Sequence, residues 1–142
     1  MNKSGPVVVI EDDEDDRMMF EEAFKNLNFK NSIVFFKNGQ EALDFLNSTE
    51  IIPFIILSDI NMPLLNGFEL RTKIHADGQL HLKCIPFLFF STAANKLSVT
   101  EAYSMLVQGF FVKPNSFTEL QKTIKNIMEY WNVCIAPHEF SN

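Results

Sequence analysis

The sequence has only two cysteines among its 142 residues, Cys84 and Cys134. They are far apart in the chain and match neither the spacing of a metal site nor that of a redox pair. We interpret both as structural thiols of a protein from a reducing compartment. The cysteines therefore give no indication of metal or redox chemistry.

The sequence also lacks an apolar stretch long enough to span a bilayer. Its N-terminal apolar run, Val7–Ile10, is too short for a signal peptide. Lys and Arg number 12 against 18 Asp and Glu, which gives a formal net charge of −6, and they form no cluster. A nucleic-acid surface is therefore not expected. We expect a soluble, cytoplasmic protein that binds no membrane.

What the sequence does contain is six acidic residues in succession, from Glu11 to Asp16, directly after the apolar run. Carboxylates crowded at the end of a buried strand resist burial unless a positive charge neutralises them. A hard divalent cation, which prefers oxygen ligands, would do so. Acidic residues are also favoured in the first turn of a helix, and a helix beginning near Asp15 would use some of them there. The run alone leaves both interpretations open.

Short apolar runs alternate with stretches of helical periodicity along the chain. Strands that are apolar on both faces and separated by helices indicate an α/β fold with a five-stranded, parallel, doubly wound sheet. Strands are expected at Val7–Ile10, Ser32–Phe36, Phe54–Leu57, Phe87–Phe90 and Gly109–Val112. Five helices are expected from near Asp15, around Ala42–Leu46, from Phe68 to an end at Asp77-Gly78, around Val99–Leu106, and over Phe117–Trp131.

Polar residues of a particular kind follow these strands. Right-handed crossovers bring the carboxyl ends of parallel strands to one edge, where such sheets bind ligands. The residues there are Glu11 and Asp12, Asp59, Ser91 and Thr92, and Lys113. Carboxylates can hold Mg²⁺, and the ammonium and a hydroxyl, which we assign to Ser91 rather than Thr92, can bind phosphoryl oxygens. One carboxylate can also act as a nucleophile and form an acyl phosphate.

Each of these residues has an ordinary structural interpretation when it is taken singly. Asp59 could cap a turn, Ser91 could cap a helix, and Lys113 beside Pro114 could be an exposed loop charge. All of these interpretations would have to hold together for the edge to have no function. The conjunction therefore favours a site for a divalent cation and a phosphoryl group.

Five motifs occur in order over roughly Val7 to Trp131. They are Val9-Ile10-Glu11-Asp12-Asp13, Ser58-Asp59-Ile60-Asn61-Met62-Pro63, Asn66-Gly67, Pro86 to Ser91, and Phe110-Phe111-Val112-Lys113-Pro114. Together they resemble the receiver domain of two-component response regulators, in a stand-alone, chemotaxis-regulator-like form. The resemblance implies the flavodoxin-like (βα)5 fold. Residues 1–131 would form the receiver domain, and residues 132–142 a short C-terminal tail with no output domain.

The resemblance also implies a role for each matching residue. Asp59 would be the phosphoacceptor, and Ser91 and Lys113 would bind the phosphoryl group. Glu11, Asp12 and Asp59, with the main-chain carbonyl of Asn61, would hold Mg²⁺ or Mn²⁺. Ser91 and Phe110 would form the switch, and Pro114 would follow a bond that is commonly cis in the family. Asn61 and Ala93, two residues beyond Asp59 and Ser91, would flank the line of water attack.

Departures from the family pattern limit what the resemblance implies. The first acid is Glu11 rather than Asp, and Asp13 adds negative charge beside the site. Phe110 lacks the tyrosine hydroxyl that often occupies its position, so an output that needs that hydroxyl is in doubt. The stretch Leu106–Gly109 replaces the usual Gly-Ala pair before the last strand, which puts the local turn and the partner surface in doubt.

The function implied is a phosphorylation switch. A histidine kinase or a histidine phosphotransfer protein would phosphorylate Asp59, and the surface of the last two predicted helices and the last strand would then bind an unidentified downstream protein. We expect a monomer or a phosphorylation-linked homodimer. It would catalyse only its own phosphoryl transfer and dephosphorylation, and would not bind nucleic acid directly.

Two other functions were weighed against this one. A Mg²⁺-dependent phosphohydrolase would often carry a second Asp two residues after the nucleophile, but Asn61 occupies that position and no cap domain is present. A receiver that binds a partner without being phosphorylated is disfavoured, since the acid pair, Asp59, Ser91 and Lys113 are all in place.

Overall fold

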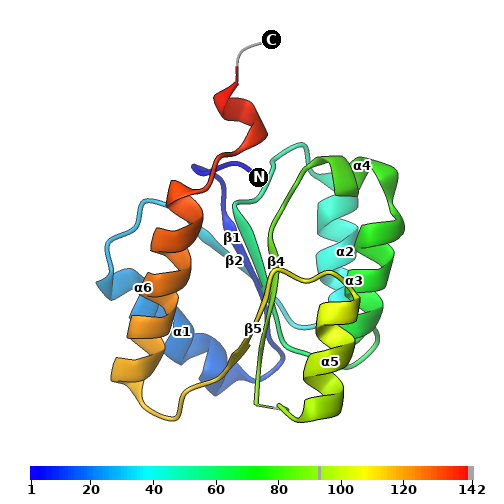
Figure 1. Ribbon diagram of the computed structural model, residues 1–142. Helices are drawn as coiled ribbons and strands as arrows, with labels where there is room; N and C mark the ends of the chain where they lie inside the picture. The colour runs from blue at the N-terminus through cyan, green and yellow to red at the C-terminus, as the bar shows by residue number, and fades with distance from the viewer. Residues whose placement is uncertain (93, 141–142) are drawn as a thin grey trace.

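The computed structural model describes residues 1–92 and 94–140. A central parallel sheet separates two layers of helices: α1 and α6 cover one face, and α2, α3 and α5 cover the other (Figure 1). This is the doubly wound α/β architecture that the alternation of strands and helices predicted. No helix in the described ranges is both long and apolar enough to cross a membrane.

The sheet has five strands in the order β2-β1-β3-β4-β5, and every neighbouring pair is parallel. Strands β1, β3 and β4 are buried along their whole length, which explains why their sequences are continuous apolar runs. The strands span Val7–Ile10 (β1), Ile33–Phe36 (β2), Ile55–Ser58 (β3), Phe87–Ser91 (β4) and Gly109–Val112 (β5).

Each long helix begins at a side chain that accepts a hydrogen bond from a free backbone N–H of the first turn. The capping residues are Asp13, Asn38, Asn66, Asn95 and Ser116. The helices span Glu14–Asn26 (α1), Gly39–Ser48 (α2), Gly67–Ala76 (α3), Gly78–Leu82 (α4), Lys96–Ser104 (α5) and Phe117–Val133 (α6).

The short helix α4 was not predicted. Asp77-Gly78 was expected to end the preceding helix, and Asp77 does lie at the C-terminus of α3. The side chain of Asp77 also accepts hydrogen bonds from the backbone of Gln79 and Leu80, and it thereby caps a new helix. One residue both ends a helix and begins the next, so the expectation of five helices was wrong by one.

The core is divided by the sheet into two clusters of buried side chains. Val7 and Val9 of β1 face α1 and α6, whereas Val8 and Ile10 face α2, α3 and α5. This alternation follows from the two-residue period of a strand. Because both faces of β1 are covered, its end can place polar residues only at the edge of the sheet.

The last described residues pack against the beginning of the chain, at the end of the sheet where the strands begin (Figure 1). Lys3 forms an ion pair with Glu139 at 2.9 Å, and Ala136 is fully buried. Helix α6 continues to Val133, two residues beyond its expected end at Trp131, and a short 3₁₀ helix spans Pro137–Glu139. The described part of the tail is therefore ordered against the body.

Candidate functional site

Three carboxylates meet where β1 and β3 end. Glu11 and Asp59 each continue the sheet by one backbone hydrogen bond, Glu11 N–H to Phe36 O at 2.9 Å and Asp59 N–H to Ile10 O at 3.0 Å. Glu11 is only 4% exposed, Asp59 is half-buried and Asp12 is exposed. One oxygen from each of Glu11, Asp12 and Asp59 lies within 4.8 Å of the other two. The sheet therefore assembles the acidic group that the sequence predicted.

Lys113 reaches this acidic group from the end of β5. Its backbone N–H donates to Ser91 O at 3.1 Å, which extends the pairing of β4 and β5 by one residue. Its ammonium contacts the Glu11 carboxylate and lies 3.1 Å from Asp59 Oδ2. The ammonium thus neutralises part of a negative charge that the fold concentrates at this edge.

A fourth carboxylate, that of Asp16, was not predicted as a site residue. Asp16 lies in the first turn of α1, and its Oδ2 accepts from the Lys113 ammonium at 3.1 Å. The sequence predicts that some acids of the run serve the start of the helix, and Asp13 does so by accepting a hydrogen bond from the Asp16 backbone N–H. No signal in the sequence distinguishes an acid that caps from one that turns toward the site.

Burial and crowding change the acid–base properties of the pair Glu11 and Lys113. The pKa of Glu11 is raised to about 8, chiefly by loss of solvent; the nearby Asp59 contributes to the rise, and Lys113 opposes it. For Lys113, burial alone would lower the pKa, but the hydrogen bond to Glu11 and the charges of Asp59 and Glu11 outweigh it and raise the pKa. The site therefore holds more negative charge than one ammonium can balance.

The donor set fits a hard divalent cation. Glu11 Oε2 is buried and has no hydrogen-bond partner among the described residues. A buried carboxylate oxygen left without a donor is costly unless something else satisfies it. Carboxylate oxygens from Glu11, Asp12 and Asp59 are the ligands that Mg²⁺ and Mn²⁺ prefer. The group therefore fits a cation of this kind.

The remaining predicted residues lie around this group. Ser91 is the last residue of β4, opposite Val112, and is buried, whereas Thr92 is exposed. Asn61 lies in the exposed loop after Asp59. The Phe110 ring is half-buried, and its centroid lies 6.0 Å from that of Phe89. Ala93 lies outside the described residues.

Two local expectations at β5 have clear outcomes. No peptide bond in the described chain is cis, so the bond before Pro114 is trans, which is the usual state of an X–Pro bond. The unusual stretch Leu106–Gly109 forms its turn with Leu106 at a φ of 61°, in the left-handed region where glycine is favoured. The carbonyl of Leu106 accepts from Arg71 at 2.8 Å. Arg71 thus supports the strained turn.

Known proteins are similar to this chain in sequence and in fold. A family model described as the response regulator receiver domain matches residues 7–125. The probable methanogenesis regulatory protein FilR2 of Methanothrix harundinacea is 30% identical over an alignment of 129 residues that covers 88% of this chain and 82% of FilR2.

Two solved structures are also similar to this chain. One is the phosphorylated cyanobacterial phytochrome response regulator RcpA, with a TM-score of 0.82 and 27% identity over 93% of this chain and 97% of RcpA. The other is the Mn²⁺-bound form of response regulator Rcp1, with a TM-score of 0.78 and 25% identity over 93% of this chain and 99% of Rcp1.

The doubly wound parallel sheet, with its acidic, lysine-bridged carboxyl edge, places the chain in the class of α/β domains that bind ligands at the carboxyl ends of their strands. Within that class, this chain belongs to the response regulator receiver domain family. Receiver domains act in two-component signalling as phosphorylation-dependent switches. Histidine kinases or phosphotransfer proteins phosphorylate them on an aspartate, and they bind Mg²⁺ or Mn²⁺ at an acidic pocket and signal to downstream targets.

Proposed function

We propose that this chain is a single-domain response regulator that accepts a phosphoryl group on Asp59. The contact of the Lys113 ammonium with both Asp59 and Glu11 is the observation that carries the proposal. It gives Asp59 a partly neutralised environment beside a positive group that can bind phosphoryl oxygens. Residues 1–131 would act as the receiver domain, and residues 132–142 as a tail, in the cytoplasm.

Glu11, Asp12 and Asp59 would hold Mg²⁺, or Mn²⁺ as in the Rcp1 structure, together with the main-chain carbonyl of Asn61. When bound, the cation supplies positive charge that offsets repulsion between the carboxylates and the incoming phosphoryl group. Glu11 is buried and fixed by the sheet, so its oxygens stay in place for this role.

The chemistry is a transfer between two covalent bonds. A carboxylate oxygen of Asp59 attacks phosphorus as the bond from phosphorus to a histidine nitrogen of the donor protein breaks, and the nitrogen keeps the electron pair. Lys113 and Ser91 bind the oxygens of the transferred group. Water later attacks the acyl phosphate, which restores the carboxylate and releases phosphate. The chain thus catalyses only its own modification.

The output is a change of surface near α5, β5 and α6. Ser91, drawn toward the phosphoryl group, leaves space toward which the half-buried Phe110 ring moves. Exposed apolar side chains on this side, Leu97, Tyr103, Val112 and Tyr130, offer contacts for a downstream protein or a second copy of the chain. Phosphorylation would bias two pre-existing arrangements of this surface.

The test is the intact mass of the protein after incubation with acetyl phosphate, with and without Mg²⁺. We expect a gain of one phosphoryl group that requires Mg²⁺ and is lost in Asp59→Asn. Asp15→Asn is the matched control, because it makes the same change on the exposed side of α1. No gain in a folded, Mg²⁺-binding protein would contradict the proposal and favour an interaction module that works without phosphorylation.

A further inference from the structure

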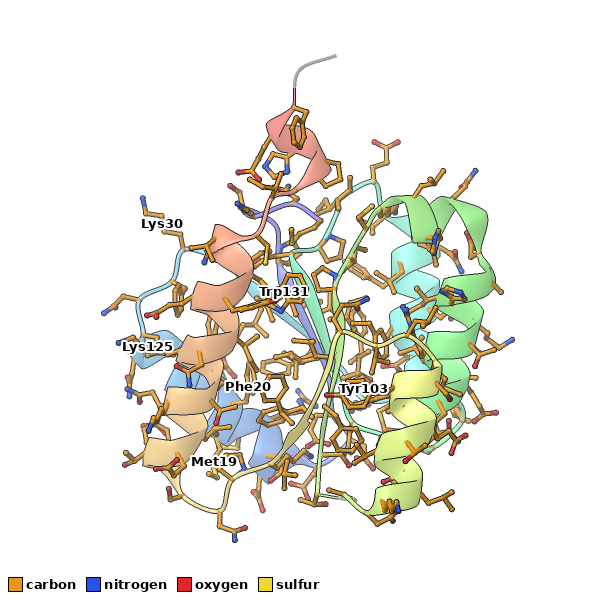
Figure 2. The ribbon with its side chains drawn as sticks, viewed as in Figure 1. Met19, Phe20, Lys30, Tyr103, Lys125 and Trp131 are labelled. Atoms are coloured by element: carbon orange, nitrogen blue, oxygen red, sulfur yellow. The ribbon has the colours of Figure 1, made fainter. Side chains whose placement is uncertain are left out.

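A second cavity lies at the opposite edge of the sheet, where the strands begin. It has a volume of about 290 Å³, is partly open to solvent, and is lined by residues of α3, α4 and α6 and of the segments that precede β4 and β5. Trp131 of α6, one of its lining residues, lies toward this end of the molecule, whereas Phe20 of α1 lies toward the acidic edge (Figure 2). The cavity is thus separate from the phosphorylation site.

A buried arginine forms part of the cavity wall. Arg71 of α3 is 7% exposed. Its Nε donates to Met105 O at 3.1 Å and one terminal nitrogen donates to Leu106 O at 2.8 Å, while its guanidinium carbon lies 5.6 Å from the centre of the Phe87 ring. Both acceptors are neutral carbonyls at the end of α5. None of the ion pairs in the described part of the chain includes Arg71.

A buried guanidinium without an anion is unusual, because charged side chains are rarely buried unless they are paired. Burial lowers the pKa of Arg71, which is the sign of a desolvated charge. The guanidinium has five N–H donors, and the two carbonyl bonds leave several of them without a protein acceptor among the described residues, facing the solvent of the cavity. These donors are available for an anion that enters the cavity.

The other side chains of the cavity suit an anion with an apolar body. His75 and His81 lie at the surface with ring centroids 5.1 Å apart, and no Asp or Glu is among the described residues that line the cavity. Apolar side chains, among them Ile74, Ile85 and Trp131, form much of the remaining wall. An inorganic anion could bind the Arg71 guanidinium but would make no use of this apolar wall.

We propose that this cavity binds a small organic acid, with its carboxylate on the Arg71 guanidinium and its apolar body against Ile74, Ile85 and Trp131. Guanidinium and carboxylate match in geometry, since two parallel N–H groups can donate to two oxygens. The volume of this cavity is near the lower end of the range for ligand pockets, which begins at about 300 Å³. It therefore suits a small ligand of about one ring. This role adds to the capping of α5 by Arg71 and does not replace it.

Trp131 is the only tryptophan of the chain, so its fluorescence reports on the cavity directly. We expect a saturable change in its emission when the full-length protein is titrated with benzoate. Benzamide, the neutral counterpart, should bind at least about tenfold more weakly, because it lacks the charge-assisted bonds. Inorganic phosphate should also bind more weakly, because it has no apolar body.

Variants assign the binding to Arg71. Arg71→Gln should weaken benzoate binding about tenfold, and His81→Gln should weaken it less. Lys73→Gln is the matched control, because it removes a positive charge from an exposed position of the same helix. Circular dichroism shows whether each variant is folded.

Three results would overturn the proposal: no saturable response to benzoate, equal binding of benzamide, or equal weakening by Lys73→Gln and Arg71→Gln. If Arg71→Gln does not fold, the affinity of Arg71→Lys for benzoate and the comparison of benzoate with benzamide test the proposal instead. Loss of acetyl phosphate reactivity bears only on the proposed function, because Asp59 lies at the other edge.

Discussion

Two positively charged side chains, those of Lys113 and Arg71, lie partly or fully buried at opposite edges of one sheet, and their surroundings differ. Lys113 at the carboxyl edge contacts the three carboxylates of Glu11, Asp16 and Asp59. Among the described residues, Arg71 at the amino edge donates only to the carbonyls of Met105 and Leu106. One edge therefore has surplus negative charge, and the other has an unbalanced positive charge. The two ends of the same sheet thus present charge of opposite sign.

Removing the Lys113 ammonium at the carboxyl edge should have the largest effect, and the effect is on the rate of phosphorylation. Lys113→Met removes the ammonium that pairs with Glu11, Asp16 and Asp59, and we expect phosphorylation by acetyl phosphate to slow about 100-fold, as for loss of one strong donor to a developing charge. The initial rate of mass gain measures it. Lys96→Met, at an exposed position of α5, should keep the rate within twofold. A similar loss in both variants would contradict a specific role for Lys113.

Removing the Arg71 guanidinium at the amino edge should mainly lower the stability of the folded protein. Arg71→Leu loses two charge-assisted hydrogen bonds and leaves two carbonyls at the end of α5 without their donors. We expect the free energy of unfolding to fall by about 2 kcal/mol. Urea denaturation measures the change, and Lys73→Leu should be nearly neutral. A loss below about 0.5 kcal/mol would show that the turn does not depend on Arg71.

The acidic edge should make stability depend on pH when no divalent cation is present. The pKa of Glu11 is raised from 4.5 to about 8, so between these values the folded state binds more protons than the unfolded state. Stability therefore falls as pH rises through this window. Glu11→Gln should flatten this fall and stabilise the protein at pH 9 by about 1 kcal/mol. Thermal unfolding at several pH values in EDTA tests the slope, and an unchanged slope in Glu11→Gln would contradict it.

The smallest expected effect concerns the carboxylate that only the structure revealed. Asp16 shares the Lys113 ammonium with Asp59, so Asp16→Asn leaves that ammonium with fewer competitors. Phosphorylation at saturating Mg²⁺ should become about threefold faster, because one repelling charge is also removed. Asp15→Asn provides the comparison, since Asp15 is exposed on the same turn. A slower reaction in Asp16→Asn would mean that Asp16 instead positions Lys113.

The sequence predicted the sheet and the acidic edge because both depend on order along the chain. Buried parallel strands are continuous apolar runs, and whatever follows them must meet at one edge. Glu11, Asp12, Asp59 and Lys113 came together for that reason. The roles assigned to these residues, to Asn61 and to the switch pair remain predictions that the phosphorylation experiment addresses.

Side-chain direction and tertiary pairing could not be predicted in the same way. A lone arginine on a surface helix is ordinarily exposed. Arg71 is buried because α3 packs against the turn after α5. Asp16 is one acid among six, and its contact with Lys113 depends on how α1 sits on the sheet. Helix α4 depends on the second capping role of Asp77, which one dipeptide does not reveal.

The backbone bonds that extend the sheet at Glu11, Asp59 and Lys113 have a consequence for hydrogen exchange. Each of these three N–H groups donates to a neighbouring strand and not to solvent. Such amides exchange with deuterium only when the strands separate, which for a central sheet approaches global unfolding. Glu11 and Asp59 directly follow the interior strands β1 and β3, so we expect their amides to be among the slowly exchanging ones. The backbone beneath these two carboxylates should then stay in place when a cation or a phosphoryl group changes the charge at this edge.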